Sequence, residues 1–175
     1  EPATPEGLEL SGLPRGVRAE LRGLPPELAD IVGAHLVMAG RLLDTDPERA
    51  FEHAEAAKRR ASRLPVVREA AATTAYAAGR FADALQEYRV LRRMTGSDEL
   101  FALMADCERG VGRPQAALKL VQEGLATQPA VAERVELRLV EAGARADLGQ
   151  ADEARRLLRN DIELTRGTFR VKGDT

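Results

Sequence analysis

Two histidines and one cysteine are the side chains of this chain best suited to acid–base, metal-binding or nucleophilic chemistry. His35 and His53 have no partner three or four positions away, so neither forms the spacing of a helical metal site or a catalytic triad. Cys107 lies in a stretch that contains Ala and Met, which favours a small buried thiol. The chain also contains no GxxxxGK[ST] loop and no GxGxxG turn. We therefore predict a protein without enzymatic activity, metal or cofactor, whose two histidines lie on helix surfaces.

Clustered basic side chains are the second group of residues that could form a binding site. Lys58, Arg59 and Arg60 lie near the end of one predicted helix, and Arg92 and Arg93 lie at equivalent positions of a later one. If the two helices stack, these five residues form a basic ridge able to hold phosphates of RNA or an acidic partner. The alternative is that they interact with the helix dipole and stay solvated. Because aromatic residues are only 3% of the chain, few side chains could stack on single-stranded RNA bases.

The elements that carry these residues recur along the chain. Gly79, Gly112 and Gly149 each follow an Ala-, Leu-, Arg- and Glu-rich segment, and each precedes an alanine by five positions. The three glycines are 33 and 37 residues apart. A period of this size is typical of paired helices that stack into a solenoid, in which neighbouring pairs complete one another's core.

Helix-breaking residues place the element boundaries. We predict a Pro- and Gly-rich leader over 1–25, extended over 1–14 and with a short helix near 15–22, followed by a repeat domain over 26–163 and a tail over 164–175. In the repeat domain, Asp46 and Ser97 are predicted N-caps, and Pro47 and Pro65 suit the first turns of helices. The predicted helices cover residues 27–44, 47–63, 65–78, 81–94, 98 to about 111, 114 to about 128, 131–148 and 151–163.

Composition limits the fold and the partners. Hydrophobic residues are 44% of the 175, Trp is absent, and the core must therefore consist mainly of Ala, Leu and Val. The net charge of −2 disfavours undirected attraction to nucleic acid or to an acidic membrane. A single cysteine forms no internal disulfide, and there is no signal-peptide pattern and no apolar run long enough to span a membrane. These features predict a cytoplasmic protein, and the first residue, which is not Met, suggests a piece of a longer one.

Alanine positions carry a family resemblance. Ala72, Ala105 and Ala142 each lie seven residues before a turn glycine; the alanine early in the second helix of each unit is supplied by Ala50, Ala84, Ala117 and Ala154. Tyr88 lies at the aromatic position of a second helix, where later units have Val121 and Leu158, and Pro129 lies where the third unit closes. In these features residues 27–163 resemble the tetratricopeptide repeat (TPR) family. The resemblance implies an all-α, right-handed superhelical solenoid of about four antiparallel helix hairpins. More narrowly, residues 41–61 and 104–110 resemble a poorly characterised group of actinobacterial TPR proteins.

The same resemblance implies a concave groove lined by the first helix of each unit. Its register places the following residues in the groove: Val32, His35, Ala39, Leu42 and Leu43; Val66, Glu69, Thr73, Tyr76 and Ala77; Glu99, Ala102, Asp106, Arg109 and Gly110; Glu136, Leu139, Gly143, Ala146 and Asp147. The groove is apolar at its N-terminal end and acidic towards its C-terminal end, which suits a peptide with apolar anchors followed by basic groups. Alternatively, Leu42, Leu43 and Tyr76 pack against the leader or the next helix.

The resemblance therefore predicts an adaptor or scaffold whose partner is another protein or peptide, with RNA as the alternative partner and self-association as a third reading. The family's Trp near the start of the first helix is absent, Asp46 and Pro47 replace the first turn glycine, and Asp161 replaces a small residue in the fourth unit. We expect those outer units to be irregular.

Overall fold

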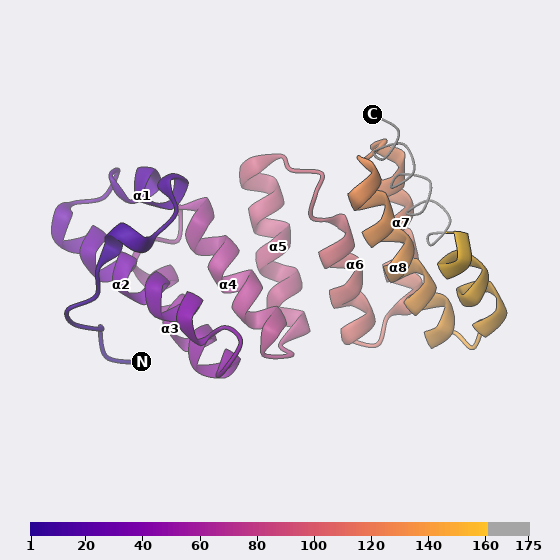
Figure 1. Cartoon of the computed structure of the whole chain (residues 1–175), viewed down its shortest axis with the longest axis horizontal. Coiled ribbons are helices and arrows are strands. Elements are labelled where there is room, and N and C mark those ends of the chain that lie inside the picture. The colour runs from indigo at the N-terminus through magenta and orange to yellow at the C-terminus, as the bar shows by residue number, and fades with distance from the viewer. Residues whose placement is uncertain (161–175) are drawn as a thin grey trace, which may run out of the picture. The chain divides into compact units, whose positions relative to one another are not determined.

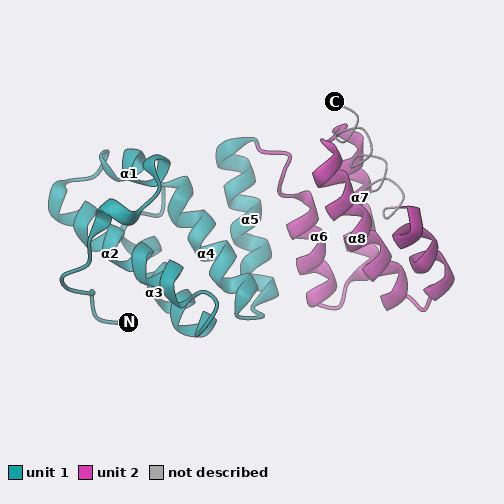
Figure 2. Ribbon diagram, viewed as in Figure 1, with its two compact units in different colours: residues 1–96 teal, residues 97–175 magenta. Residues whose placement is uncertain are grey.

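The computed structural model describes residues 1–160, which contain helices and no β-strand (Figure 1). The chain divides into two compact units, residues 1–96 and residues 97–175 (Figure 2). Unit 1 contains η1 (Leu10–Gly12), α1 (Arg15–Leu21), α2 (Pro26–Leu42), α3 (Pro47–Arg60), α4 (Pro65–Ala77) and α5 (Phe81–Thr95). Unit 2 contains α6 (Phe101–Gly110), α7 (Pro114–Ala126), α8 (Val131–Asp147) and a further helical stretch over 151–160. The all-helical prediction is confirmed; the predicted tail and the last residues of the eighth predicted helix lie outside the described range.

Each unit is built from helix hairpins packed in order. In unit 1 the hairpins are α2–α3 and α4–α5, α3 packs on α4, and the first helices α2 and α4 also touch. In unit 2, α6 packs on α7, α7 packs on α8, and α6 also touches α8. Contact between the first helices of successive hairpins, as in α2–α4 and α6–α8, is the packing pattern of stacked helical repeats. The predicted hairpin architecture is therefore present within each unit.

Alanine allows this close packing. The seven alanines that carry the sequence resemblance are all buried: Ala50, Ala72, Ala84, Ala105, Ala117, Ala142 and Ala154. A methyl side chain lets helix backbones approach closely, and alanine has the highest helix propensity. Tyr88 and Val121 are buried as expected, whereas Leu158 is exposed and its neighbour Leu157 joins Ala142 and Ala154 instead.

The three hairpin turns that contain a glycine share one conformation. Gly79, Gly112 and Gly149 have positive φ angles of 74°, 81° and 78°. In the first turn the Arg80 amide donates to the Ala75 carbonyl and the Gly79 amide donates to the Tyr76 carbonyl, at 2.8 and 3.0 Å. The other two turns repeat this pair of bonds, which is the Schellman ending of a helix. The left-handed turn predicted at Gly79 is therefore confirmed.

The first residues of the helices agree with the predicted starts except at α6. The Asp46 carboxylate accepts a hydrogen bond from the Arg49 amide at 3.2 Å, as expected of an N-cap. The prediction of a helix start at Ser97 is wrong, because α6 begins at Phe101 after Leu100. The Ser97 hydroxyl accepts from the Glu99 amide at 3.2 Å within a turn, so it organises the link that precedes α6.

The leader is attached to the first hairpins rather than simply extended. It forms the short 3₁₀ helix η1 where an extended segment was expected, and the predicted short helix is present as α1. The side chains of Leu10 and Leu21 lie over Gly33 of α2, and a Cβ atom there would be 3.0 Å from Leu10 Cδ1. The Glu20 carboxylate of α1 accepts from the Val66 amide in the first turn of α4 at 3.2 Å. The leader thus contacts both α2 and α4.

Candidate functional site

A pocket opens in unit 1 between α1, α2 and α4, with a volume of about 300 Å³. The leader supplies one wall through Leu13, Pro14 and Val17. The remaining lining comes from α2 and α4: Leu36, Ala39, Gly40, Leu43, Val66, Glu69, Ala70, Thr73 and Thr74. Five of these residues, Ala39, Leu43, Val66, Glu69 and Thr73, were predicted to line the groove.

The pocket is apolar except for one charge. Among the described residues that line it, Glu69 alone is charged, and it is exposed. The hydroxyl of Thr74 donates to the Ala70 carbonyl at 2.7 Å, so its polarity is satisfied within α4. An apolar cavity with a carboxylate at its edge suits a ligand that joins an apolar group to a cation.

The other groove residues predicted for unit 1 lie outside this pocket: Val32, His35, Leu42, Tyr76 and Ala77. The ring of Tyr76 packs edge-on against Phe81, the first residue of α5, with centroids 5.7 Å apart and planes at 82°. Val32 is fully buried and Leu42 is half-buried. The structure thus places Tyr76 against the next helix, in line with the alternative interpretation for that residue, and places Leu43 beside the leader.

His35 is the clearest departure from the predicted surface. Its side chain is fully buried, and that of His53 is 3% exposed. The two Nδ1 atoms are 3.0 Å apart, so one ring donates to the other. The prediction that both histidines lie on helix surfaces is therefore wrong. The reason is packing: the two residues lie at nearly equal distances along the chain from the α2–α3 loop, so the antiparallel hairpin brings them face to face.

In unit 2 the structure brings together three predicted groove residues of the acidic end. The Arg109 guanidinium on α6 donates from Nε to Asp147 Oδ2 at 2.8 Å and from a terminal nitrogen to Asp106 Oδ1 at 3.0 Å. It lies over Gly143 of α8, where a Cβ atom would collide with it. The hydrogen bond with Asp147 raises the pKa of Arg109 above its usual range. Ala102, also on α6, is half-buried. The cluster of Asp106, Arg109 and Asp147 therefore carries one net negative charge.

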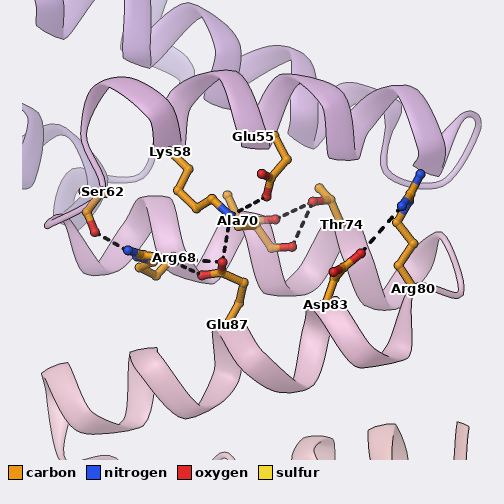
Figure 3. A network of polar contacts seen from close by, with 10 residues as sticks. Glu55, Lys58, Ser62, Arg68, Ala70, Thr74, Arg80, Asp83 and Glu87 are labelled. Atoms are coloured by element: carbon orange, nitrogen blue, oxygen red, sulfur yellow. Dashed lines mark hydrogen bonds and ion pairs between the residues drawn. The ribbon is translucent and has the colours of Figure 1, made fainter. Parts of the chain in front are cut away.

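Most of the predicted basic ridge is paired with carboxylates. Lys58 Nζ lies 2.9 Å from Glu55 Oε1 and 2.8 Å from Glu87 Oε1, and Arg68 also binds Glu87 at 3.0 Å (Figure 3). The contact from Lys58 on α3 to Glu87 on α5 shows that the second helices of the two hairpins approach each other, as the ridge prediction requires.

The next two ridge residues bind the start of the leader. Arg59 Nε lies 3.4 Å from one carboxylate oxygen of Glu1, and Arg60 hydrogen-bonds the other. Farther along α5, Arg92 is partly buried and Arg93 is exposed. Pairing of Lys58, Arg59 and Arg60 lowers the positive potential that the ridge offers to phosphate.

The sequence-based prediction did not include two features that the structure shows, the leader wall of the pocket and the buried carboxylate of Glu87. The leader wall of the pocket lies outside the repeat period and so gives no periodic signal. Glu87 is 5% exposed although glutamate is seldom buried, and its two cations come from α3 and α4. A helical projection of α5, which places Glu87 beside Ala84 and Leu91 on the buried stripe, is the signal that could have found it.

The described residues contain no group of three or more His, Cys, Asp or Glu side chains arranged to hold a metal ion. Cys107 is buried as predicted, and burial raises the pKa of its thiol to about 12. Within residues 1–160, none of the helices has both the length and the apolar composition required to cross a bilayer.

Comparison with known proteins agrees with this architecture. No protein-family model matches the chain. No curated protein matches it either. Among solved structures, a crystal structure of nearly identical TPR-like repeats from a putative kinesin light chain of Podosopora anserina is similar, with a TM-score of 0.70 and 17% identity. That match covers 88% of this chain and 84% of the other. The MamA structure from MSR-1 has a TM-score of 0.65 and 14% identity, covering 88% of this chain and 94% of the other. The chain therefore has the TPR-like helical repeat fold.

Proposed function

We propose that this protein is a binding module for another protein or peptide, and that the pocket between α1, α2 and α4 receives an apolar side chain of the partner. The observation that carries the proposal is the pocket itself, a cavity of about 300 Å³ whose lining includes five residues predicted for the groove. Fold-level likeness to repeat proteins agrees with this role but does not identify a partner.

Burial of an apolar side chain supplies the main attraction. Full burial of a Leu- or Phe-sized side chain contributes about 1.5–3 kcal/mol. Glu69 then favours partners with Lys or Arg next to the apolar anchor, because no cation among the described lining residues competes for its carboxylate. Binding energy comes from the apolar contact, and the charge sets the orientation of the partner.

A selection from displayed random peptides tests this proposal. We expect the enriched peptides to share an apolar residue close to a Lys or Arg. The variant Thr73→Arg fills the pocket and adds a repelling charge, so it should weaken binding at least about tenfold, equivalent to about 1.4 kcal/mol. Glu69→Gln should weaken binding by a smaller factor, about two- to fivefold, because exposed ion pairs contribute about 0.2–1 kcal/mol.

The matched control is Gln86→Arg, which adds the same side chain at an exposed position of α5 outside the pocket lining. It should leave the affinity unchanged. Peptides whose binding is unaffected by Thr73→Arg, or a selection without the apolar–basic pattern, would contradict the proposal.

RNA binding through the basic ridge is the second candidate. Its support is the approach of α3 to α5 at Lys58, and its weakness is the set of carboxylates that already pair with three of the five cations. A gel shift at low salt, lost when Arg59, Arg60, Arg92 and Arg93 are changed to Glu, would support it. The absence of any shift at low salt would remove it.

A further inference from the structure

The leader and the histidine pair meet on one side of the α2–α3 hairpin. The hydroxyl oxygen of Thr4 lies 3.5 Å from His35 Nε2, and on the other edge of that ring His35 Nδ1 lies 3.0 Å from His53 Nδ1. The ring centroids are 5.2 Å apart with planes at 42°. The imidazoles are the chain's only two, and both are buried.

A second contact holds the leader at the same place. The Glu1 carboxylate binds Arg59 and Arg60 at the end of α3. Residues 1–4 are therefore attached at both ends, by Glu1 to α3 and by Thr4 to the histidine pair. The same segment walls a second, polar pocket of about 400 Å³ through Glu1 and Pro2, together with residues of α3 and Arg80.

The contact between the two Nδ1 atoms depends on protonation. In the neutral pair one Nδ1 carries a hydrogen and donates it to the other, which accepts with its lone pair. The first added proton places a charge inside a buried site, which costs free energy. After a second proton binds, both Nδ1 atoms carry hydrogens that face each other, so neither can accept and the hydrogen bond at 3.0 Å is lost.

The surroundings oppose protonation of the pair. Burial is the largest cause that lowers the pKa of both His35 and His53 below the ordinary value of 6.5, and the charge of His53 lowers the pKa of His35 further. The charged groups around the pair are His53, Arg59, Arg60 and Glu1 for His35, and Arg49 and Glu52 for His53. The arginines lower the pKa, whereas Glu1 and Glu52 raise it.

We propose that the His35–His53 pair is a pH-dependent clasp that keeps residues 1–4 on the α2–α3 hairpin at neutral pH and releases them in acid. In the closed form Thr4 covers the Nε2 edge of His35, so leader release opens this edge to water, which favours the protonated ring. Because burial in the closed form lowers the pKa of both rings, this form is favoured over any form with hydrated rings above about pH 6.5, and the advantage is lost as the pH falls through and below that value. Because the rings are coupled, the two protons bind in macroscopic steps that belong to the pair.

Nuclear magnetic resonance of the full chain tests the clasp. The ring signals of both histidines and the backbone heteronuclear NOE of Ala3 and Thr4 are followed from about pH 7.5 to about pH 5. We expect NOE values close to those of the helices at neutral pH and values typical of a flexible segment in acid. The midpoint of that change should coincide with the titration of the rings and lie below pH 6.5. Circular dichroism should show unchanged helix content across the transition.

Two variants sharpen the test. The double variant His35→Gln/His53→Gln contains no imidazole, so its leader NOE values should not change with pH over this range. Glu1→Gln should lower the NOE values at neutral pH by weakening the second attachment, whereas Glu9→Gln, at an exposed position of the leader away from this attachment, should not. Neither of these leader variants replaces a histidine, so both remain informative if the double variant does not fold.

Three results would overturn the clasp. The first is a constant Thr4 NOE while the rings titrate, and the second is titration of both rings at the ordinary value of 6.5. The third is loss of helix content at the same pH as leader release, since acid would then be unfolding the hairpin rather than opening the clasp.

Discussion

At the residue scale, Glu87 illustrates how a charge is kept inside this fold. Its carboxylate is 5% exposed and binds Lys58 of α3 and Arg68 of α4, so one side chain joins three helices (Figure 3). Residue types alone did not predict this network, because it depends on which helix faces meet. The sequence did predict the burial of Cys107, since a small thiol among Ala and Met fits a packed helix face. It did not predict the buried histidine pair, because hairpin register rather than helical spacing joins those residues.

Replacement of Glu87 should therefore destabilise the protein. In Glu87→Gln the shape is kept while the charge that pairs with Lys58 and Arg68 is lost, and we expect a loss of about 1–3 kcal/mol in the free energy of unfolding. The measurement is urea denaturation followed by circular dichroism. Glu52→Gln, at an exposed carboxylate 3.8 Å from Arg49, is the matched control and should change stability by less than about 0.5 kcal/mol. Equal effects of the two changes would argue against a structural role for the Glu87 network.

Cys107 should react with thiol reagents only when unit 2 opens. Burial raises its pKa to about 12, so at about pH 8 almost none of the sulfur is thiolate, and the side chain is inaccessible as well. We expect labelling by a disulfide reagent to be much slower in the native protein than in urea. Fast labelling in the absence of denaturant would show that α6 opens readily.

At the element scale, the boundaries that could be predicted are those set by local chemistry. Pro47 and Pro65 lie in first turns, and Gly79 ends a helix in the left-handed conformation, so backbone geometry alone places these sites. The start of α6 could not be predicted in this way. Ser97 has the chemistry of a cap, but the helix begins where Phe101 becomes buried, and this burial depends on tertiary packing.

Close packing at Gly124 gives a prediction for the second unit. A Cβ atom there would lie 2.8 Å from Phe101 Cβ of α6 and 3.0 Å from Leu137 Cδ2 of α8. Gly124→Ala gains up to about 1 kcal/mol of helix propensity, but overpacking of about 1–3 kcal/mol should make the change destabilising. Gly40→Ala in α2 has open space around the new methyl group and should be neutral or stabilising. Thermal unfolding compares the two, and a stabilised Gly124→Ala protein would show that α6 and α8 can move apart.

At the scale of the whole molecule, the period of the glycine turns predicted paired helices, and the structure has them in each unit. The period did not indicate the division after Gly96, because it runs across that point without interruption. Nor did it indicate the pocket wall, since Leu13, Pro14 and Val17 precede the first repeat. Five of the pocket residues followed from the register, whereas the leader contacts depend on tertiary packing.

The division into two units predicts local rather than uniform effects of mutation. Glu87→Gln acts within residues 1–96 and Gly124→Ala within residues 97–175. Stacked repeats are stabilised mainly by nearest-neighbour contacts, so native-state hydrogen exchange should accelerate most in the unit that carries the change. Equal acceleration in both units for both variants would instead show that the chain opens as a single cooperative body.

The leader wall of the pocket has a consequence for how recognition can diverge. Three of its lining side chains belong to a segment outside the helical repeats, and none of them is one of the buried alanines of the repeat pattern. Related chains could thus acquire new ligand preferences by changing a few leader residues while keeping an identical scaffold. In such a lineage, the segment with the weakest periodic pattern in the sequence would evolve as the part of the domain that sets its selectivity.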